Sequence, residues 1–455
     1  MFQLIIELSR YAFIFYILYF LWQGVVYLLH ERGVKPDRPR ASAKQRACVV
    51  LFHVSAYAIL AYQPGQYMFD TQILFTGAIG LGFLTGSFLV ASLFFSRTCP
   101  LIWNGMFFLL DIGFVMLQRL NADTAQKQVI YACIGALAAL LAALAFIIVS
   151  RFEKMEYAYL AISFLLLILP FFIGDRTNGS LNWVTVGAIT FQPSEIAKFF
   201  YVFFLASDLY KQKTMVKLIP SAAAAFCFML ILTFQNDLGG ALIFFLTYLI
   251  MVYIATGKLR LFFAGLAAAS VGSVIAYHFV AHVQTRVSVW LNPWADPFDK
   301  GLQILQSLFA IGTWGLLGSG LTRGIPEVVP VAASDFIFSA ICEEFGGLFG
   351  LCMIGIFFMV FYRGVNVALR SESPYLSLLA IGFTGMFVLQ TFLIIGGVTK
   401  FIPMTGVTLP FVSAGGSSVV ISMAMISILQ MIGIAKHKSG GSFISRAGSV
   451  TAGEL

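Results

Sequence analysis

A polar stretch between two hydrophobic segments holds the residue best placed to do chemistry. Residues 290–298 read Trp-Leu-Asn-Pro-Trp-Ala-Asp-Pro-Phe, so Asp296 has Pro293 and Pro297 close to it. Proline restricts the backbone and interrupts helices, so the acid is expected on a turn. Elsewhere hydrophobic residues make up 60% of the 455 residues, and charged residues only 11%. Because acids are costly in such a chain, we predict that Asp296 takes part in chemistry.

A second acid precedes a base by three residues. Residues 191–198 read Phe-Gln-Pro-Ser-Glu-Ile-Ala-Lys, which places Glu195 and Lys198 on neighbouring surfaces of a helix that begins near Pro193. Ionisable groups in lipid usually face a partner or a cavity. We predict that the two residues form a buried pair at a substrate site. The alternative is a pair that only fixes helix packing.

Residues 334–347 contain three further acids. At 100° per residue, Asp335, Ser339 and Glu343 follow one helical face, whereas Glu344 points nearly the opposite way. Asp335 also suits the first turn of a helix, where the helix dipole favours an anion. Capping is the alternative for Asp335, but it does not account for the two deeper acids.

Small and polar residues are dense in the stretch 406–418. The residues of interest there are Ser413, Gly415, Gly416 and Ser417. Glycine and serine at this density permit close helix approach, or a broken helix whose freed amides meet a polar head group. Asp237 similarly starts a span with small residues, and a helix cap is its alternative role.

Long apolar runs must position these residues, and they predict an all-α, polytopic helical bundle in a membrane. About thirteen runs are long enough to span a bilayer. They are 2–29, 47–63, 70–95, 100–118, 128–150, 156–173, 192–209, 217–235, 237–256, 260–280, 335–362, 375–397 and 408–434. The first run is too long for a signal peptide and lacks a cleavage pattern, so it is expected to be a span.

Every second loop is basic, which predicts the orientation. The basic loops follow the first span and lie near residues 151–154, 211–217, 258–260, 363–370 and 436–438, so they are expected in the cytoplasm. The N-terminus then lies outside, the C-terminus inside, and the loop 281–334 outside. Cations on the outer side are expected either to gather around an anionic substrate or to anchor the interface. They are Arg119, Lys127, Arg176, Arg286, Lys300, Arg323 and Lys400.

Other classes of site have little support. The net charge of +8 is accounted for by topology and by contact with anionic lipids, so we expect no nucleic-acid partner. The six cysteines lack CxxC spacing and read as small core residues. The spacing of histidine and cysteine supports no metal site. The tail 438–455 is rich in Gly and Ser and is expected to be disordered in the cytoplasm.

In combination and in order, these motifs resemble those of the SEDS family, which comprises the FtsW, RodA and SpoVE proteins. The resemblance covers about residues 99–437, or ten spans. The sequence of the motifs is closer to the FtsW/SpoVE branch than to RodA. It rests on the stretches 178–198, 237–239, 292–307, 318–320, 335–344 and 403–418. The chain departs from the family pattern at Asn236, Leu302, Ala333-Ser334 and Ala414. Residues 1–98 form an N-terminal extension of about three spans outside this core.

The resemblance implies a peptidoglycan glycosyltransferase of the bacterial plasma membrane that polymerises lipid II at the outer surface. It makes Asp296 the candidate general base of an inverting transfer, and it makes Arg286, Lys198, Arg119 and Lys127 candidates for the pyrophosphate. The whole set expected to bind substrate is Glu195, Lys198, Arg286, Gln303, Gln306, Ser307, Asp335, Glu343, Arg119, Lys127, Ser413, Gly415, Gly416 and Ser417. A divalent cation, Mg²⁺ or Mn²⁺, could share the leaving-group role, although no cofactor is certain.

The resemblance also implies partners and leaves alternatives. A class B penicillin-binding transpeptidase would supply cross-linking, and divisome or elongasome membrane proteins would accompany it. A lipid II flippase or transporter is one alternative, because a many-span bundle with a buried ion pair and a broken helix also suits alternating access. A non-catalytic division scaffold is the other. Elongation, division and sporulation all stay open, and Asp111, in the middle of a span, has no assigned role.

Overall fold

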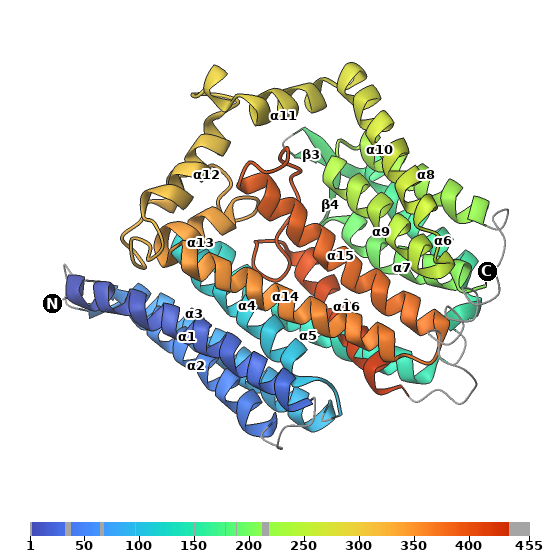
Figure 1. The fold of residues 1–455 in the computed structure, drawn as a ribbon. Coiled ribbons are helices and arrows are strands. Elements are labelled where there is room, and N and C mark those ends of the chain that lie inside the picture. Colours follow the sequence, from blue (N-terminus) through green and yellow to red (C-terminus); the bar gives the residue numbers. More distant parts are fainter. Residues whose placement is uncertain are drawn as a thin grey trace, which may run out of the picture.

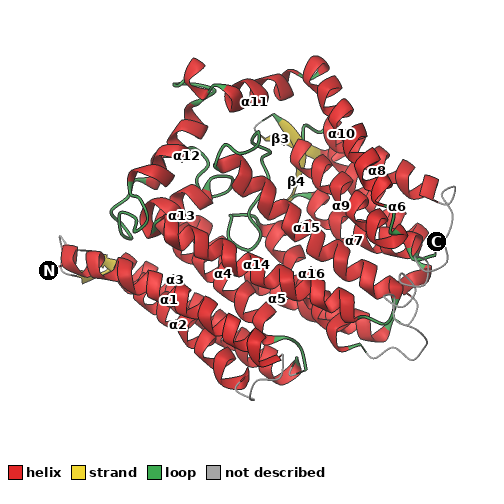
Figure 2. Ribbon diagram, in the orientation of Figure 1, coloured by secondary structure: helices red, strands yellow, loops and turns green. Residues whose placement is uncertain are grey.

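The computed structural model describes residues 2–31, 38–63, 68–95, 97–149, 152–177, 179–187, 189–211 and 218–435. These residues form a bundle of long helices with little sheet (Figures 1 and 2). The predicted fold class, an all-α polytopic membrane protein, is therefore confirmed. The predicted disordered tail, 438–455, lies outside the described residues.

The described residues contain α-helices numbered α1 to α16. Their bounds are α1 Phe2–Glu31, α2 Arg38–Ala61, α3 Thr71–Phe94, α4 Pro100–Leu120, α5 Ala122–Ile148, α6 Glu156–Ile173, α7 Pro193–Leu209, α8 Ile219–Phe234, α9 Leu238–Thr256, α10 Leu259–Phe279, α11 Ala281–Leu291, α12 Leu302–Thr313, α13 Ile337–Phe345, α14 Gly347–Arg370, α15 Pro374–Val398 and α16 Gly416–Ile434. Short 3-10 turns lie at Phe152–Lys154, Pro293–Ala295 and Pro326–Val328.

Ten of the described helices are long and apolar enough to cross a membrane: α1, α3 to α6, α9, α10 and α14 to α16. The count is lower than the thirteen predicted spans because α2 has basic residues in its first half, and α7 and α8 have only 17 and 16 residues. These three helices nevertheless lie within the bundle: α2 packs on α1, α3 and α4, α7 packs on α6, and α8 packs on α9.

Two predicted spans do not form as single helices. The span predicted at 335–362 is broken at Gly346, whose φ of 96° ends α13 before α14 begins. Glycine is needed there because the backbone of Gly346 approaches that of Gly318 too closely for a side chain. The span predicted at 408–434 becomes helical only at Gly416. The preceding residues form an irregular segment in which Phe411 has a φ of 69°.

Helix α4 lies at the centre of the bundle, since residues 101–118 are all buried. The N-terminal helices share its core. Phe13 of α1 and Phe52 of α2 pack against Phe345 of α13, with ring centroids 5.3 Å and 5.8 Å away. In Figure 1, α1 to α3 lie along one side of α4 and α14. The predicted extension is thus packed into the bundle.

A buried contact between a histidine and an aspartate fastens α2 to α4 at the middle of the bundle. Nδ1 of His53 lies 2.5 Å from Oδ1 of Asp111, and both side chains are buried. Nε2 of His53 donates to the carbonyl oxygen of Gly77 in α3 at 2.9 Å. Asp111, which had no assigned role, therefore joins the core to the N-terminal helices.

Loops and short strands cover one end of the bundle. Strands β3 (Gly174–Thr177), β4 (Ser180–Val186) and β5 (Ile189–Phe191) form an antiparallel sheet between α6 and α7. The register pairs Gly174 with Val184 and Val184 with Phe191. Strands β1 (Tyr62–Gln63) and β2 (Met68–Phe69) form a separate pair. At the top of Figure 1, α11 runs away from α10 and α12 returns towards α13, so the loop with Asp296 extends over this end.

Candidate functional site

The predicted pair of Glu195 and Lys198 is present at the start of α7. Nζ of Lys198 lies 2.8 Å from Oε1 of Glu195, and the two residues are 5% and 8% exposed. Nζ also donates to Oε1 of Gln390 in α15 at 3.1 Å. The ammonium group is therefore held between two helices, with one carboxylate to balance its charge.

Gln390 extends this contact to the segment before α16. Its Nε2 donates to the carbonyl oxygen of Thr408 at 2.8 Å. The hydroxyl of Thr408 in turn donates to Oγ of Ser418 at 3.1 Å. Gln390 and Thr408 were not among the residues predicted for the site. An amide within the apolar run 374–398 was the available signal, because a polar group at that depth needs a partner.

Asp237 lies at the same site and has two functions in the fold. Its Oδ1 accepts a hydrogen bond from the amide of Gly240 at 2.8 Å, so it caps α9 as the alternative reading expected. Its Oδ2 accepts from Nε2 of Gln192 at 3.1 Å. The backbone amide of Gln192 donates to Oγ of Ser417 at 3.2 Å, which brings Ser417 beside the start of α7.

Arg286 of α11 reaches the segment before α16 from the other side. Its Nη1 donates to the carbonyl oxygen of Thr405 at 2.9 Å, and its guanidinium faces Asp335 and Asp237. Burial lowers the pKa of Arg286, and the two carboxylates oppose that shift. Gly406, with a φ of 73°, lies between Arg286 and Asp335. The arginine stays charged because its pKa is far above neutrality.

Asp335 does not lie in a helix, which corrects the predicted shared face with Ser339 and Glu343. It precedes α13, in a turn, and burial raises its pKa to about 6 against the opposing effects of Ser334 and Arg286. Ser339 instead contacts Ser307, and Glu343 accepts from the amide of Ile325 at 2.8 Å. The helical spacing was misleading because the helix begins only at Ile337.

Glu343 and Glu344 both face the loop 318–327. Gly324 lies between them, since a Cβ added there would be 3.1 Å from Oε1 of Glu343 and 3.0 Å from Cγ of Glu344. The prediction that Glu344 points away from Glu343 is therefore wrong. These two residues lie in the last turn of α13, and the loop wraps around both.

Arg119 is held by this same loop. Its Nε donates to Oε1 of Glu344 at 2.8 Å, its Nη2 donates to the carbonyl oxygen of Gly324 at 3.0 Å, and its Nη1 pairs with Glu327. With these partners, Arg119 fastens α4 to α13 at a place apart from Lys198 and Arg286. Lys127 is exposed on α5. Of the four cations predicted for a pyrophosphate, Lys198 and Arg286 share a neighbour, because both interact electrostatically with Asp237.

Asp296 is half-buried at the end of the 3-10 turn Pro293–Ala295. The loop is closed by Gly301, whose amide donates to the carbonyl oxygen of Asp296 at 2.8 Å. A side chain at Gly301 would clash with the carbonyl oxygen of Pro293. Within the described residues no hydrogen bond or ion pair is found for the Asp296 carboxylate. The structure does not place it in contact with Lys198 or Arg286.

The other predicted residues divide between exposed and structural positions. Gln303 is exposed and Gln306 half-buried on α12. Ser307 is fully buried, and its hydroxyl lies 2.7 Å from Oγ of Ser339 and donates to the carbonyl oxygen of Val398 at 3.0 Å, so it fastens α12 to α13 and α15.

Ser413 and the two glycines after it shape the segment before α16. Oγ of Ser413 accepts from the amide of Leu409 at 2.9 Å and donates to the carbonyl oxygen of Ser334 at 2.6 Å. Gly415 is the N-cap of α16, and Gly416 packs against the ring of Tyr131, since a Cβ added at Gly416 would be only 2.6 Å from that ring. The contact of Gly416 fits close packing, which was one of the two alternatives for this stretch.

A metal site is not apparent in the donor set of the described ranges. They contain no group of three His, Cys, Asp or Glu side chains positioned to hold an ion. The carboxylates of Glu195 and Asp237 are already engaged by Lys198, Gly240 and Gln192.

A family model decides the relationship. The model FTSW_RODA_SPOVE, described as "Cell cycle protein", matches residues 49–438. The chain belongs to the FtsW/RodA/SpoVE family. The match begins within α2, and so includes α3 as well as the core predicted to start at residue 99. The boundary at residue 98 stays a prediction.

Relatives from all three branches of the FtsW/RodA/SpoVE family are similar to this chain. The peptidoglycan glycosyltransferase RodA of Mycobacterium tuberculosis is 31% identical over 394 residues, which cover 78% of this chain and 82% of the relative. Stage V sporulation protein E of Bacillus subtilis is 34% identical, with 70% and 93% covered. A probable peptidoglycan glycosyltransferase FtsW of Geobacter sulfurreducens is 36% identical, with 56% and 71% covered. The identities support the family rather than one branch.

Solved structures agree with this family assignment. A chain of a peptidoglycan synthase complex, described as coordinating polymerization and crosslinking, is similar with a TM-score of 0.64 and 25% identity, covering 74% of this chain and 97% of that one. The Rod shape determining protein RodA of Thermus thermophilus has a TM-score of 0.58 and 24% identity, covering 75% and 98%. The second likeness shows the fold alone.

Proposed function

We propose that this FtsW/RodA/SpoVE protein is a peptidoglycan glycosyltransferase that polymerises lipid II at the outer face of the cytoplasmic membrane. The observation that carries the proposal is a pair of cations, the buried Lys198 and the half-buried Arg286, at the end of the bundle that the loop of Asp296 covers. The names of the relatives support the reaction type.

The chemistry needs a base and a stabilised leaving group. The bond from the donor sugar C1 to the pyrophosphate oxygen breaks, and its electron pair leaves with the pyrophosphate. The acceptor hydroxyl oxygen bonds to C1, and its proton passes to a base. Asp296 is assigned as that base, since the residue is half-buried and its carboxylate has no hydrogen-bond or ion-pair partner within the described residues. The α-linked donor and the β-linked product imply inversion in a single displacement.

Lys198 and Arg286 are assigned to the pyrophosphate. Preorganised cations that face a developing negative charge stabilise the transition state more in a water-poor site than they would in water. Both are held in place, Lys198 by Glu195 and Gln390, and Arg286 by the carbonyl oxygen of Thr405. Arginine can bind phosphate oxygens with two parallel hydrogen bonds, which would fix the orientation of the leaving group.

The remaining candidates have secondary roles in this proposal. Arg119 is assigned to the loop 318–327, because three acceptors already engage its guanidinium. Lys127, Gln303 and Gln306 are accessible and stay candidates for substrate contact. Mg²⁺ or Mn²⁺, when bound, would add positive charge at the pyrophosphate, and phosphate oxygens with one carboxylate would be its ligands.

The proposal extends to location and partners. The protein is a multi-pass membrane protein, with its N-terminus proposed outside and its C-terminus in the cytoplasm. Contacts of Arg10 and Glu7 in α1 with Gly318 and Arg323 support an N-terminal end on the same side as the loop 281–334. A class B penicillin-binding transpeptidase is the proposed partner, because a similar chain occurs in a complex that couples polymerization to crosslinking. Division, elongation or sporulation complexes would contain this protein together with its transpeptidase partner.

Lipid II polymerisation by the purified protein tests the function. The full chain, alone and with a class B transpeptidase, is incubated with lipid II, and glycan length is measured. Glycan strands are expected. Movement of lipid II across vesicles without longer glycan would contradict the proposal in favour of a flippase. An absence of both, with and without the partner, would favour a scaffold.

A further inference from the structure

A polar cavity lies where α4 begins and where α14 and α16 end. It has a volume of about 250 Å³. Arg97, Arg363 and Arg370 line it together with the amides of Asn366 and Gln430. Arg363 is buried, although it belongs to a helix long enough to span the membrane. Among the described residues that line the cavity there is no acid, so the charged side chains of this lining are all arginines.

The cavity lies at the end of α4 that is remote from Arg119. Helix α4 begins at Pro100 beside the cavity and ends at Leu120 next to Arg119, about 30 Å away at 1.5 Å per residue. The basic connections are at the cavity end, which makes it the predicted cytoplasmic end. An occupant there would meet the inner leaflet, so the inference does not rest on the proposed function.

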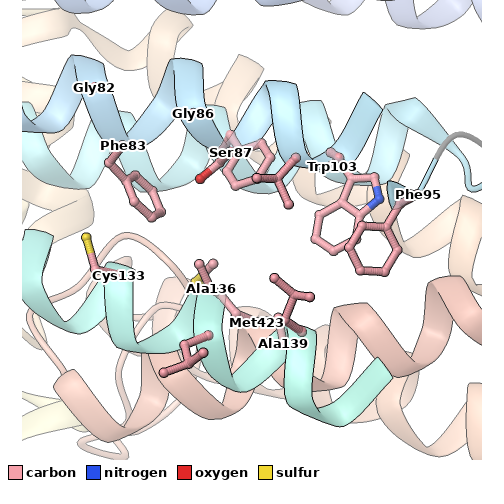
Figure 3. Close-up of a pocket in the computed structure, with 15 residues that line it drawn as sticks. Gly82, Phe83, Gly86, Ser87, Phe95, Trp103, Cys133, Ala136, Ala139 and Met423 are labelled. Atoms are coloured by element: carbon pink, nitrogen blue, oxygen red, sulfur yellow. The ribbon is translucent and has the colours of Figure 1, made fainter. Parts of the chain in front are cut away.

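An apolar groove of about 380 Å³ runs between α3 and α5. Figure 3 shows Gly82, Phe83, Gly86 and Ser87 on one wall and Cys133, Ala136 and Ala139 on the other, with Trp103 and Phe95 at one end. A Cβ added at Gly82 or Gly86 would meet nothing within 4 Å, so the two glycines leave the groove open.

The groove has the depth of one lipid leaflet. From Gly82 to Phe95 the helix rises about 20 Å, whereas half of the hydrocarbon core is about 15 Å. An acyl chain that enters from one leaflet can therefore lie along α3 for its full length.

The cavity and the groove meet at the connection between α3 and α4. Phe95 lines the groove, and Arg97, two residues later, lines the cavity. Trp103 lines the groove, and its Nε1 donates to Oγ1 of Thr98, which lines the cavity, at 2.9 Å. One short segment thus contacts both spaces.

We propose that the cavity and the groove together bind one anionic glycerophospholipid of the inner leaflet. Its phosphate lies among Arg97, Arg363 and Arg370, and one acyl chain lies in the groove between α3 and α5. Arginine recognises phosphate through several charged hydrogen bonds, and basic pockets between membrane helices suit anionic head groups. A free phosphate would use the cavity alone and leave the groove empty.

Retention of lipid by the full-length protein tests the arginine cavity. The protein is exchanged into detergent with equal phosphatidylglycerol and phosphatidylcholine, and bound lipid is counted by native mass spectrometry. Wild-type protein is expected to retain more phosphatidylglycerol than phosphatidylcholine. Arg97→Gln/Arg370→Gln is expected to bind it about 25-fold more weakly, from about fivefold for each basic residue. The control Lys258→Gln/Arg260→Gln removes the same charge from exposed positions at the start of α10 and should retain the lipid.

Two further results would overturn the proposal. One is equal retention of phosphatidylglycerol by the cavity variant and by its control. The other is complete displacement of the lipid from wild-type protein by inorganic phosphate at millimolar concentration, which would assign the cavity to a free anion. For the groove, Gly86→Leu is expected to reduce retention several-fold. Gly272→Leu, at an equally open position of α10, should leave it unchanged, and an equal effect of the two leucines would remove the groove from the site.

Discussion

Nζ of Lys198 lies 2.8 Å from Oε1 of Glu195, while Gln390 occupies a second position on the same ammonium group. Breaking this buried pair at one end strands a charge, which costs about 3–5 kcal/mol. Glu195→Gln and Lys198→Met are therefore each expected to lower the melting midpoint in detergent more than half as much as the double variant. A double-mutant cycle measures the difference. Strictly additive losses would show that the two charges do not depend on each other.

Asp296→Asn is expected to reduce glycan polymerisation by about 10²-fold or more, the contribution of a general base, with an unchanged melting midpoint. The reason is that asparagine keeps the shape and loses the proton acceptor. Asp299→Asn, in the same exposed loop, is the matched control and should retain activity. Wild-type glycan length from the Asp296 variant would remove this residue from the mechanism.

Gly301→Ala is expected to displace the loop of Asp296, because the new methyl group would clash with the carbonyl oxygen of Pro293. Polymerisation should fall strongly although no chemical group has been lost. Gly312→Ala, near the end of α12, is the control. A Cβ added at Gly312 would meet no atom within 4 Å. Equal activity of the two variants would show that the closed loop is not needed.

The buried carboxyl of Asp335 predicts a pH dependence of stability. Its pKa is raised from 3.8 to about 6 in the folded protein, chiefly by burial. The folded state then holds the proton more tightly than the unfolded state, so stability is lost as pH rises from about 4 to 6. The loss is at most about 3 kcal/mol, since one pKa unit corresponds to about 1.4 kcal/mol.

Melting midpoints of wild type and Asp335→Asn measured across this pH range test the expectation. The fall in midpoint with rising pH should be larger for the wild type than for the variant. Parallel curves for the two proteins would contradict it.

Single cysteines in a cysteine-free background test the orientation. Ser288→Cys, exposed on α11, is expected to react with an impermeant thiol reagent in intact cells. A cysteine near the start of α2 is expected to react only after permeabilisation. Ala43 is the better site, because Ser42 is buried and its hydroxyl accepts from Nδ2 of Asn104 at 3.1 Å. Labelling of Ala43→Cys in intact cells would overturn the predicted topology.

The parts of the site that sequence could predict depend on local spacing. Glu195 and Lys198 are three residues apart on one helix, so their pairing follows from helical geometry alone. The contact of Lys198 with Gln390 joins residues 192 positions apart, and nothing local indicates it. Likewise, Arg119 pairs with Glu344, 225 residues later, and nothing in the neighbouring sequence indicates that contact.

The helix boundaries that sequence missed have a similar cause. The run from 335 to 362 has the hydrophobicity of one span, and hydropathy does not register a change of backbone direction. Gly346 ends α13 because the chain must pass close to Gly318, a contact made only in the folded bundle. Turn residues reveal such a break only when the neighbouring segment is known.

The pair of His53 and Asp111 makes the N-terminal helices hard to remove. A protein shortened to begin at α4 would keep Asp111 in the middle of the bilayer without the histidine that lies 2.5 Å from it. It would also lose the rings of Phe13 and Phe52 from beside Phe345. An uncompensated carboxylate in hydrocarbon costs several kcal/mol, so truncation would need a neutral residue at position 111. The N-terminal helices are therefore part of the packed core of the helical bundle. A shortened version of this protein would need substitutions in α4 as well as the truncation.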